Sequence, residues 1–129
     1  MKDNDMITVT AFLVVKNAVD AIGFYTAAYK AIEIKRHAMQ GEKLMAKMII
    51  GGSEFWVGDE EPKYDNLSPD AHSHNPVRMI LQTKNADELF INAIKLGATE
   101  ICPMTTETVW RIGKLKDPFG HVWEIGYVL

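Results

Sequence analysis

The chain contains 129 residues, 47% of them hydrophobic and 24% charged, which suits a single globular domain with a sizeable core and excludes disordered and membrane-spanning classes. Its formal net charge of −3 offers no basic surface for nucleic acid or anionic lipid. Because the first residues contain no apolar leader and Cys102 is the sole cysteine, we expect a cytoplasmic protein without disulfides that binds small molecules or other proteins.

The first half of the chain predicts a strand, a helix and three more strands. β-Branched residues predict a strand over residues 7–15. Asn17 can cap a helix over residues 18–31, in which Ile22, Tyr25 and Tyr29 form an apolar stripe. Turns that contain glycine then separate three strands, which we predict over residues 32–38, 43–50 and 54–58.

The second half of the chain repeats this order. A strand over residues 77–83 precedes a helix over residues 86–96, and strands follow over residues 98–102, 106–115 and 121–129. We therefore predict an α+β fold in one domain, with βαβββ modules over residues 6–59 and 76–129 and a polar linker over residues 60–75. Because each helix covers one face of its sheet, the two other faces are expected to enclose a common trough.

A turn and the strand that follows it carry the clearest functional signal. Residues 117–120, Asp-Pro-Phe-Gly, predict a sharp turn because proline and glycine favour its backbone angles. Alternation along the next strand places Glu124 on the face opposite Trp123 and Ile125. We expect His121, at the start of that strand, to make a buried structural hydrogen bond. Glu124 is then either a surface carboxylate or part of a functional cavity.

The paired modules, with the terminal motif Asp-Pro-Phe-Gly-His-Val-Trp-Glu at residues 117–124, resemble the vicinal oxygen chelate superfamily. This superfamily includes glyoxalase I, bleomycin-resistance proteins and extradiol dioxygenases. The chain is most similar to its PhnB-like subgroup, through residues 21–25, 50–53 and 111–121. The resemblance covers nearly the whole chain and implies a glyoxalase-like fold and a homodimer.

In metal-dependent members, one side chain from the first and fourth strands of each module binds a divalent ion. The resemblance places these four positions at Thr10, Trp56, Arg78 and Glu124. Only Glu124 is an ordinary ligand, because threonine binds metals poorly, tryptophan offers no lone pair and arginine is a cation. The subgroup's histidine and acid on the third strand are also replaced, by Met45 and Lys47. We therefore expect no metal cofactor.

Strand alternation predicts a mixed aromatic and charged trough. The residues expected to face it are Phe12, Met45, Lys47, Trp56, Arg78, Gln82 and Glu124, with Trp110 or Arg111 near its rim. A buried charge needs a partner, so we expect an ion pair between Arg78 and Glu124. The predicted function is the binding of a small organic molecule, with Trp56 as a stacking wall and Lys47 or Arg78 binding an anionic or carbonyl group.

Two alternatives stay open. In the first, the protein is a metal-dependent lyase, isomerase or dioxygenase, with Glu124 as a general base or as one ligand of a divalent ion. In the second, the Arg78–Glu124 pair fills a vestigial site and the protein acts through its dimer surface.

Overall fold

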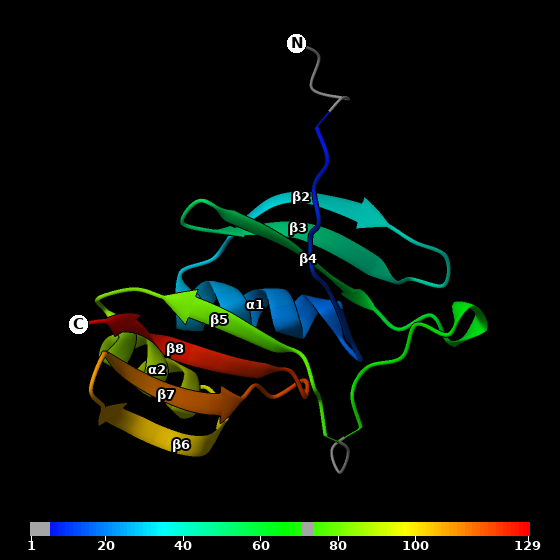
Figure 1. The fold of residues 1–129 in the computed structure, drawn as a ribbon. Coiled ribbons are helices and arrows are strands. Elements are labelled where there is room, and N and C mark those ends of the chain that lie inside the picture. The colour runs from blue at the N-terminus through cyan, green and yellow to red at the C-terminus, as the bar shows by residue number, and fades with distance from the viewer. Residues whose placement is uncertain (1–5, 71–73) are drawn as a thin grey trace.

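The computed structural model describes residues 6–70 and 74–129 and contains two modules of the same element order (Figure 1). The first module consists of β1 (Phe12–Val15), α1 (Ala18–Tyr29), β2 (Ile32–Ala38), β3 (Leu44–Ile50) and β4 (Ser53–Asp59). The second module consists of β5 (Arg78–Gln82), α2 (Ala86–Lys95), β6 (Thr99–Thr106), β7 (Trp110–Lys116) and β8 (Val122–Val128). A short 3-10 helix, η2 (Pro62–Tyr64), lies in the linker between them.

Each module forms a four-stranded sheet in which the first and fourth strands are parallel neighbours. The strand orders are β1-β4-β3-β2 and β5-β8-β7-β6, and the remaining neighbours are antiparallel. The predicted α+β fold of two βαβββ modules is confirmed. No helix within residues 6–70 and 74–129 has the length and apolar character needed to cross a membrane.

One hydrophobic core joins the two modules. The helices α1 and α2 contact each other as well as their own sheets, and Figure 1 shows α1 directly beneath the first sheet. Aromatic side chains of α1 reach across to β8, where the Trp123 ring lies 5.5 Å from the ring of Tyr25 and 4.6 Å from that of Tyr29. We use the term open face for the side of each sheet turned away from this core.

Helix α1 has capping residues at both ends, whereas α2 begins without a side-chain cap. The Asn17 side chain accepts a hydrogen bond from the backbone N–H of Asp20 at 3.0 Å, as predicted for a cap. Helix α1 ends at Tyr29, two residues earlier than expected, because Lys30 adopts a left-handed conformation with φ of 60°. Asn85 precedes α2, but its side chain makes no capping hydrogen bond, although asparagine is a favoured residue at this position.

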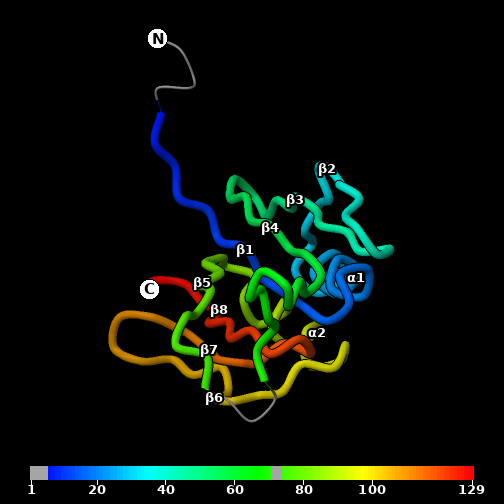
Figure 2. The backbone as a smooth tube through the Cα atoms, turned by 90° about the vertical axis from the view of Figure 1, so that its right-hand side faces the viewer, coloured from blue at the N-terminus to red at the C-terminus, as the bar shows by residue number. Residues whose placement is uncertain are grey.

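Strand β1 is shorter than predicted. The ladder with β4 begins at Phe12, opposite Trp56, and the Ala11 carbonyl oxygen still accepts the backbone N–H of Trp56 at 2.9 Å. Residues 6–10 run away from the sheet, as Figure 2 shows. Ile7 and Val9 are consequently 94% and 98% exposed. The β-branched pattern predicted a strand from residue 7, but a strand also needs a neighbour to receive its hydrogen bonds.

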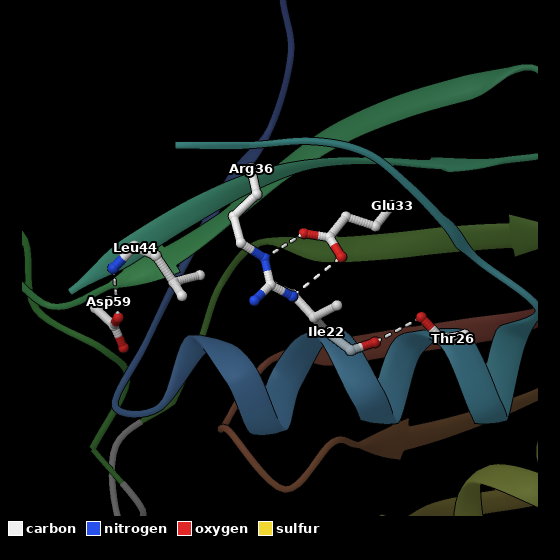
Figure 3. Close-up of polar contacts among 6 residues, drawn as sticks. All are labelled: Ile22, Thr26, Glu33, Arg36, Leu44 and Asp59. Atoms are coloured by element: carbon white, nitrogen blue, oxygen red, sulfur yellow. Dashed lines mark hydrogen bonds and ion pairs between the residues drawn. The ribbon is translucent and has the colours of Figure 1, made fainter. Parts of the chain in front are cut away.

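An irregularity in β2 changes which side chains share a face. The register with β3 shifts between Glu33 and Lys35, so Glu33 and Arg36 point the same way although they are three residues apart. Figure 3 shows the Arg36 guanidinium donating two hydrogen bonds to Glu33, at 2.6 and 3.1 Å. These hydrogen bonds raise the pKa of Arg36 above its ordinary value.

Candidate functional site

The Asp-Pro-Phe-Gly turn contains a buried carboxylate. One oxygen of Asp117 accepts the backbone N–H groups of Phe119 and His121 at 2.9 and 3.0 Å. The other accepts the Tyr25 hydroxyl at 2.5 Å and the Trp123 indole N–H at 2.9 Å. Four donors therefore satisfy this carboxylate. An aspartate that accepts a hydrogen bond from the backbone N–H two residues later in the chain is a known feature of turns. The contact of Asp117 with the first module, however, could not be predicted from the sequence.

Asp117 ties the two modules together. Its bond to Tyr25 joins positions 92 residues apart in the chain, and burial together with the Asp117 charge raises the pKa of Tyr25 well above its ordinary value. Beside it, His121 is buried and its ring Nε2 lies 2.8 Å from the Val14 carbonyl oxygen. The expected structural hydrogen bond of His121 is confirmed. The clearest motif of the sequence thus holds the modules in place.

The predicted ion pair between Arg78 and Glu124 is present on the open face of the second sheet. The Glu124 side chain is 15% exposed and that of Arg78 is 50% exposed. Lys114 lies directly opposite Glu124 on β7, so two cations flank this carboxylate on the same face. Such a pair lies close to solvent and is weaker than a buried one.

The open face of the first sheet carries the other predicted aromatic and cationic residues. The Lys47 ammonium lies 5.5 Å from the centre of the Trp56 ring and 3.2 Å from the Glu54 carboxylate. Phe12 covers Gly58, where an added Cβ would lie 2.7 Å from the Phe12 ring and 2.9 Å from Met45. Glycine at this position therefore lets the Phe12 ring lie against the sheet beside Met45.

The predicted trough residues line different hollows. Phe12 borders a hollow beside the linker, Arg78 a second, Glu124 a third and Gln82 a cavity between the modules. Trp110 lies on the open face, where its indole donates to Glu107 at 3.0 Å.

Arg111 does not reach the rim of a trough, which corrects the prediction for this residue. It points to the helix side of its sheet and donates to both carboxylate oxygens of Asp87 in α2, at 2.8 and 2.6 Å. The reason is strand alternation, since Arg111 follows Trp110 in β7 and faces the opposite side.

The side chains at the four metal positions do not fit a divalent ion. Thr10 lies in the exposed segment before β1 and is not paired with β4, where Phe12 is the residue opposite Trp56. Arg78 brings a permanent positive charge to Glu124, the one carboxylate of the set. Among residues 6–70 and 74–129, no three histidine, cysteine or acidic side chains gather in a way that could hold a metal.

A cavity of about 430 Å³ lies between the two modules. Its walls come from the end of α1, the β3–β4 turn, β5 and the start of α2, and they include Tyr29, Phe55, Leu81, Leu89 and Trp123. The Tyr29 hydroxyl is buried and has no hydrogen-bond partner among the described residues. Sequence reasoning missed this cavity because it placed Tyr29 in an apolar stripe and could not see that two modules meet there.

Comparison with known proteins gives relatives in sequence and in fold. No family model matches the chain. The Mycobacterium bovis protein Mb0911c, described as uncharacterized, is 32% identical over an alignment of 120 residues that covers 88% of this chain and 78% of the relative.

Two solved structures share the architecture. A glyoxalase/bleomycin resistance/dioxygenase family enzyme from Burkholderia phytofirmans is 22% identical, with a TM-score of 0.71 over 93% of this chain and 97% of its own. The fosfomycin resistance protein FosX from Listeria monocytogenes, solved with Mn(II) and sulfate, is 19% identical, with a TM-score of 0.67 over 95% and 93%. Likeness at these identities shows the fold.

Proposed function

The chain belongs to the family of the mycobacterial protein Mb0911c and has the fold of the glyoxalase/bleomycin resistance/dioxygenase proteins, and on this premise we propose that it binds a small organic molecule without a catalytic metal. The ion pair of Arg78 with Glu124 carries this proposal. A guanidinium held against the one suitable carboxylate repels a second cation and satisfies the charge that a metal would otherwise neutralise.

The proposed ligand is an aromatic carboxylate that binds on the open face of the first sheet. Trp56 offers a flat aromatic surface beside the ammonium of Lys47, and Phe12 with Met45 extends the apolar area. An aromatic ring can stack on Trp56 while its carboxylate replaces Glu54 as the partner of Lys47. We therefore assign ligand binding to Phe12, Met45, Lys47 and Trp56.

Titration of tryptophan fluorescence with benzoate and with benzamide tests this assignment. Both probes have one ring, but only benzoate carries the charge that Lys47 would bind. We expect wild-type protein to prefer benzoate, and Lys47→Gln to lose roughly fivefold in benzoate affinity but little for benzamide. Lys63→Gln, on the linker and stacked on Tyr64, is the matched control and should change neither. Equal binding of the two probes by wild-type protein would contradict the proposal.

We also propose a homodimer of the PhnB-like type that covers part of the open faces. Ile80 and Trp110 support this, since both are large apolar side chains on the second open face and are 64% and 40% exposed. Light scattering after size-exclusion chromatography measures the assembly. We expect a dimer in the wild-type protein and a shift towards monomer in Ile80→Asp; a wild-type monomer at micromolar concentration would contradict the proposal.

A metal-dependent enzyme is the second candidate, because FosX shares the fold and was solved with Mn(II). In that case Glu124 would bind the ion or act as a base. Elemental analysis of protein prepared without a histidine tag, combined with melting curves in divalent ions and in EDTA, separates the two candidates. A stoichiometric ion that is lost in Glu124→Ala would overturn the metal-free proposal, whereas melting curves unaffected by EDTA would support it.

A further inference from the structure

A hollow on the open face of the second sheet gathers basic side chains. It has a volume of about 290 Å³ and lies where the linker reaches β5. Its polar lining consists of Arg78, Lys114, Lys116, His74 and Asn75, and its apolar lining of Pro76, Ile101 and Val122. No acidic side chain of the described residues belongs to this lining, although the whole chain has a formal net charge of −3.

Strand pairing explains why the cations of this hollow converge. Arg78 on β5 and Lys116 on β7 both lie directly opposite Val122 on β8, one on each side of it. Neighbouring strands are about 4.8 Å apart, so the two backbones are about 10 Å apart and the two long side chains can meet over Val122. Lys114 precedes Lys116 by two residues and shares its face. Val122 is buried but lies outside the hydrophobic core, so it forms an apolar floor.

The positive charge of the hollow is only partly neutralised. Lys114 and Lys116 are half-buried, and neither side chain has an ion-pair partner among residues 6–70 and 74–129. Glu124 pairs with Nε of Arg78, which leaves the two terminal nitrogens of that guanidinium able to donate to a ligand. Three cations beside one carboxylate leave an excess of two positive charges. Like charges gathered on one face of a sheet are destabilising, and a bound anion would relieve this repulsion.

An excess of two positive charges matches a phosphate group. A phosphomonoester carries a charge of about −1.5 to −2 at pH 7 and offers three acceptor oxygens. The planar fork of arginine and the ammonium group of lysine both bind phosphate well. Because the hollow is no larger than the smallest ligand pockets, which start at roughly 300 Å³, the organic body of the ligand must be small.

From this geometry we infer that the hollow at the start of β5 binds a small phosphomonoester. Arg78, Lys114 and Lys116 surround the phosphate, and the organic body lies against Ile101 and Val122. This site is separate from the proposed carboxylate site, because Trp56 and Lys47 lie on the open face of the other sheet. It is also distant from Trp110, which supports the proposed dimer, since Trp110 and Lys116 are at opposite ends of β7.

Isopropyl phosphate and isobutyrate form a matched pair of probes for this site. They share the isopropyl group, but the first carries a phosphate and the second a carboxylate, and neither has a ring that could stack on Trp56. Inorganic phosphate is the third probe and shows whether the organic body contributes to binding. Binding is measured by calorimetry in about 0.1 M potassium chloride, which screens charges that are more than about 10 Å apart.

We expect wild-type protein to bind isopropyl phosphate roughly tenfold more tightly than isobutyrate, and more tightly than inorganic phosphate. Lys114→Gln and Lys116→Gln should each weaken the binding of isopropyl phosphate roughly fivefold, because each removes one cation but keeps a long polar side chain. Lys95→Gln is the matched control and should leave the affinity unchanged, since Lys95 is exposed at the end of α2, on the other side of the same sheet.

Three results would overturn the inference. These are no saturable binding of isopropyl phosphate, equal affinity of wild-type protein for isopropyl phosphate and isobutyrate, or an equal loss of affinity in Lys95→Gln and Lys116→Gln. Inorganic phosphate that binds as tightly as isopropyl phosphate would refute the organic body. The outcome is independent of the carboxylate site, since Lys47→Gln should leave isopropyl phosphate binding unchanged and Lys116→Gln should leave benzoate binding unchanged.

Discussion

Replacing Tyr25 by phenylalanine should destabilise the protein, whereas the same change at Tyr29 should not. The two tyrosines lie one turn apart in α1, both are buried and their rings are in contact. Each substitution removes one hydroxyl oxygen and keeps the ring. The difference lies in the partners, because Tyr25 donates to the Asp117 carboxylate at 2.5 Å and the Tyr29 hydroxyl has no partner among the described residues.

The expected magnitudes follow from these partners. A hydrogen bond to a charged group contributes about 1.5–3 kcal/mol, and Asp117 keeps three other donors in Tyr25→Phe, so we expect a loss of about 2 kcal/mol. For 129 residues, an unfolding entropy of roughly 2.1 cal/mol/K per residue converts this to a Tm about 7 °C lower. Tyr29→Phe removes an unsatisfied buried hydroxyl, and a Tm higher by about 4 °C corresponds to a gain of about 1 kcal/mol.

Differential scanning calorimetry of the wild-type protein and the two variants measures the effect, and urea unfolding provides the free energies. Near-ultraviolet circular dichroism serves as the control for an intact aromatic core. A Tyr29→Phe variant that loses as much stability as Tyr25→Phe would refute the reasoning. The Tyr29 hydroxyl would then have a partner in solution, such as an ordered water.

Two further predictions concern the second module. Arg111 donates hydrogen bonds that hold the pKa of Asp87 below its ordinary 3.8, so the stabilisation by this pair is complete above pH 3.8 and is lost as the pH falls through the lowered pKa. Because the pair is partly exposed, Asp87→Asn should lower Tm by up to about 3 °C at pH 7. A difference in Tm that persists at pH 2 would contradict this expectation. Gly126→Ala should destabilise the protein by at least about 2 kcal/mol, because the added Cβ would collide with the Arg111 carbonyl oxygen. Gly23→Ala, in an open stretch of α1, should instead stabilise the protein by about 0.5–1 kcal/mol. Equal effects of the two substitutions in chemical denaturation would refute the packing argument.

Much of the fold could be predicted from local patterns. Asn17 caps α1 as expected, and the order of helices and strands is the same in both halves. These features depend on residues within one or two turns of each other, so the sequence contains their cause. The Arg78–Glu124 pair is only partly local: strand alternation predicted the face on which each side chain lies, the resemblance implied neighbouring positions, and the pairing of β5 with β8 brings the two together.

The predictions that were wrong or incomplete depended on neighbours far away in the chain. Residues 7–10 have a strand-like pattern but lack a strand to pair with. Arg111 was expected near a trough, and the packing of α2 against β7 provides Asp87 as its partner instead.

The sequence by itself determined that Tyr25 and Tyr29 are buried, because they lie on one apolar stripe of a capped helix. Only the tertiary structure decided that they differ. Tyr25 meets Asp117, 92 positions further along the chain, and Tyr29 meets a cavity whose walls come from both modules. Periodicity reports which face of a helix is covered, but the atoms that cover it belong to other elements, and their positions depend on how the two modules pack.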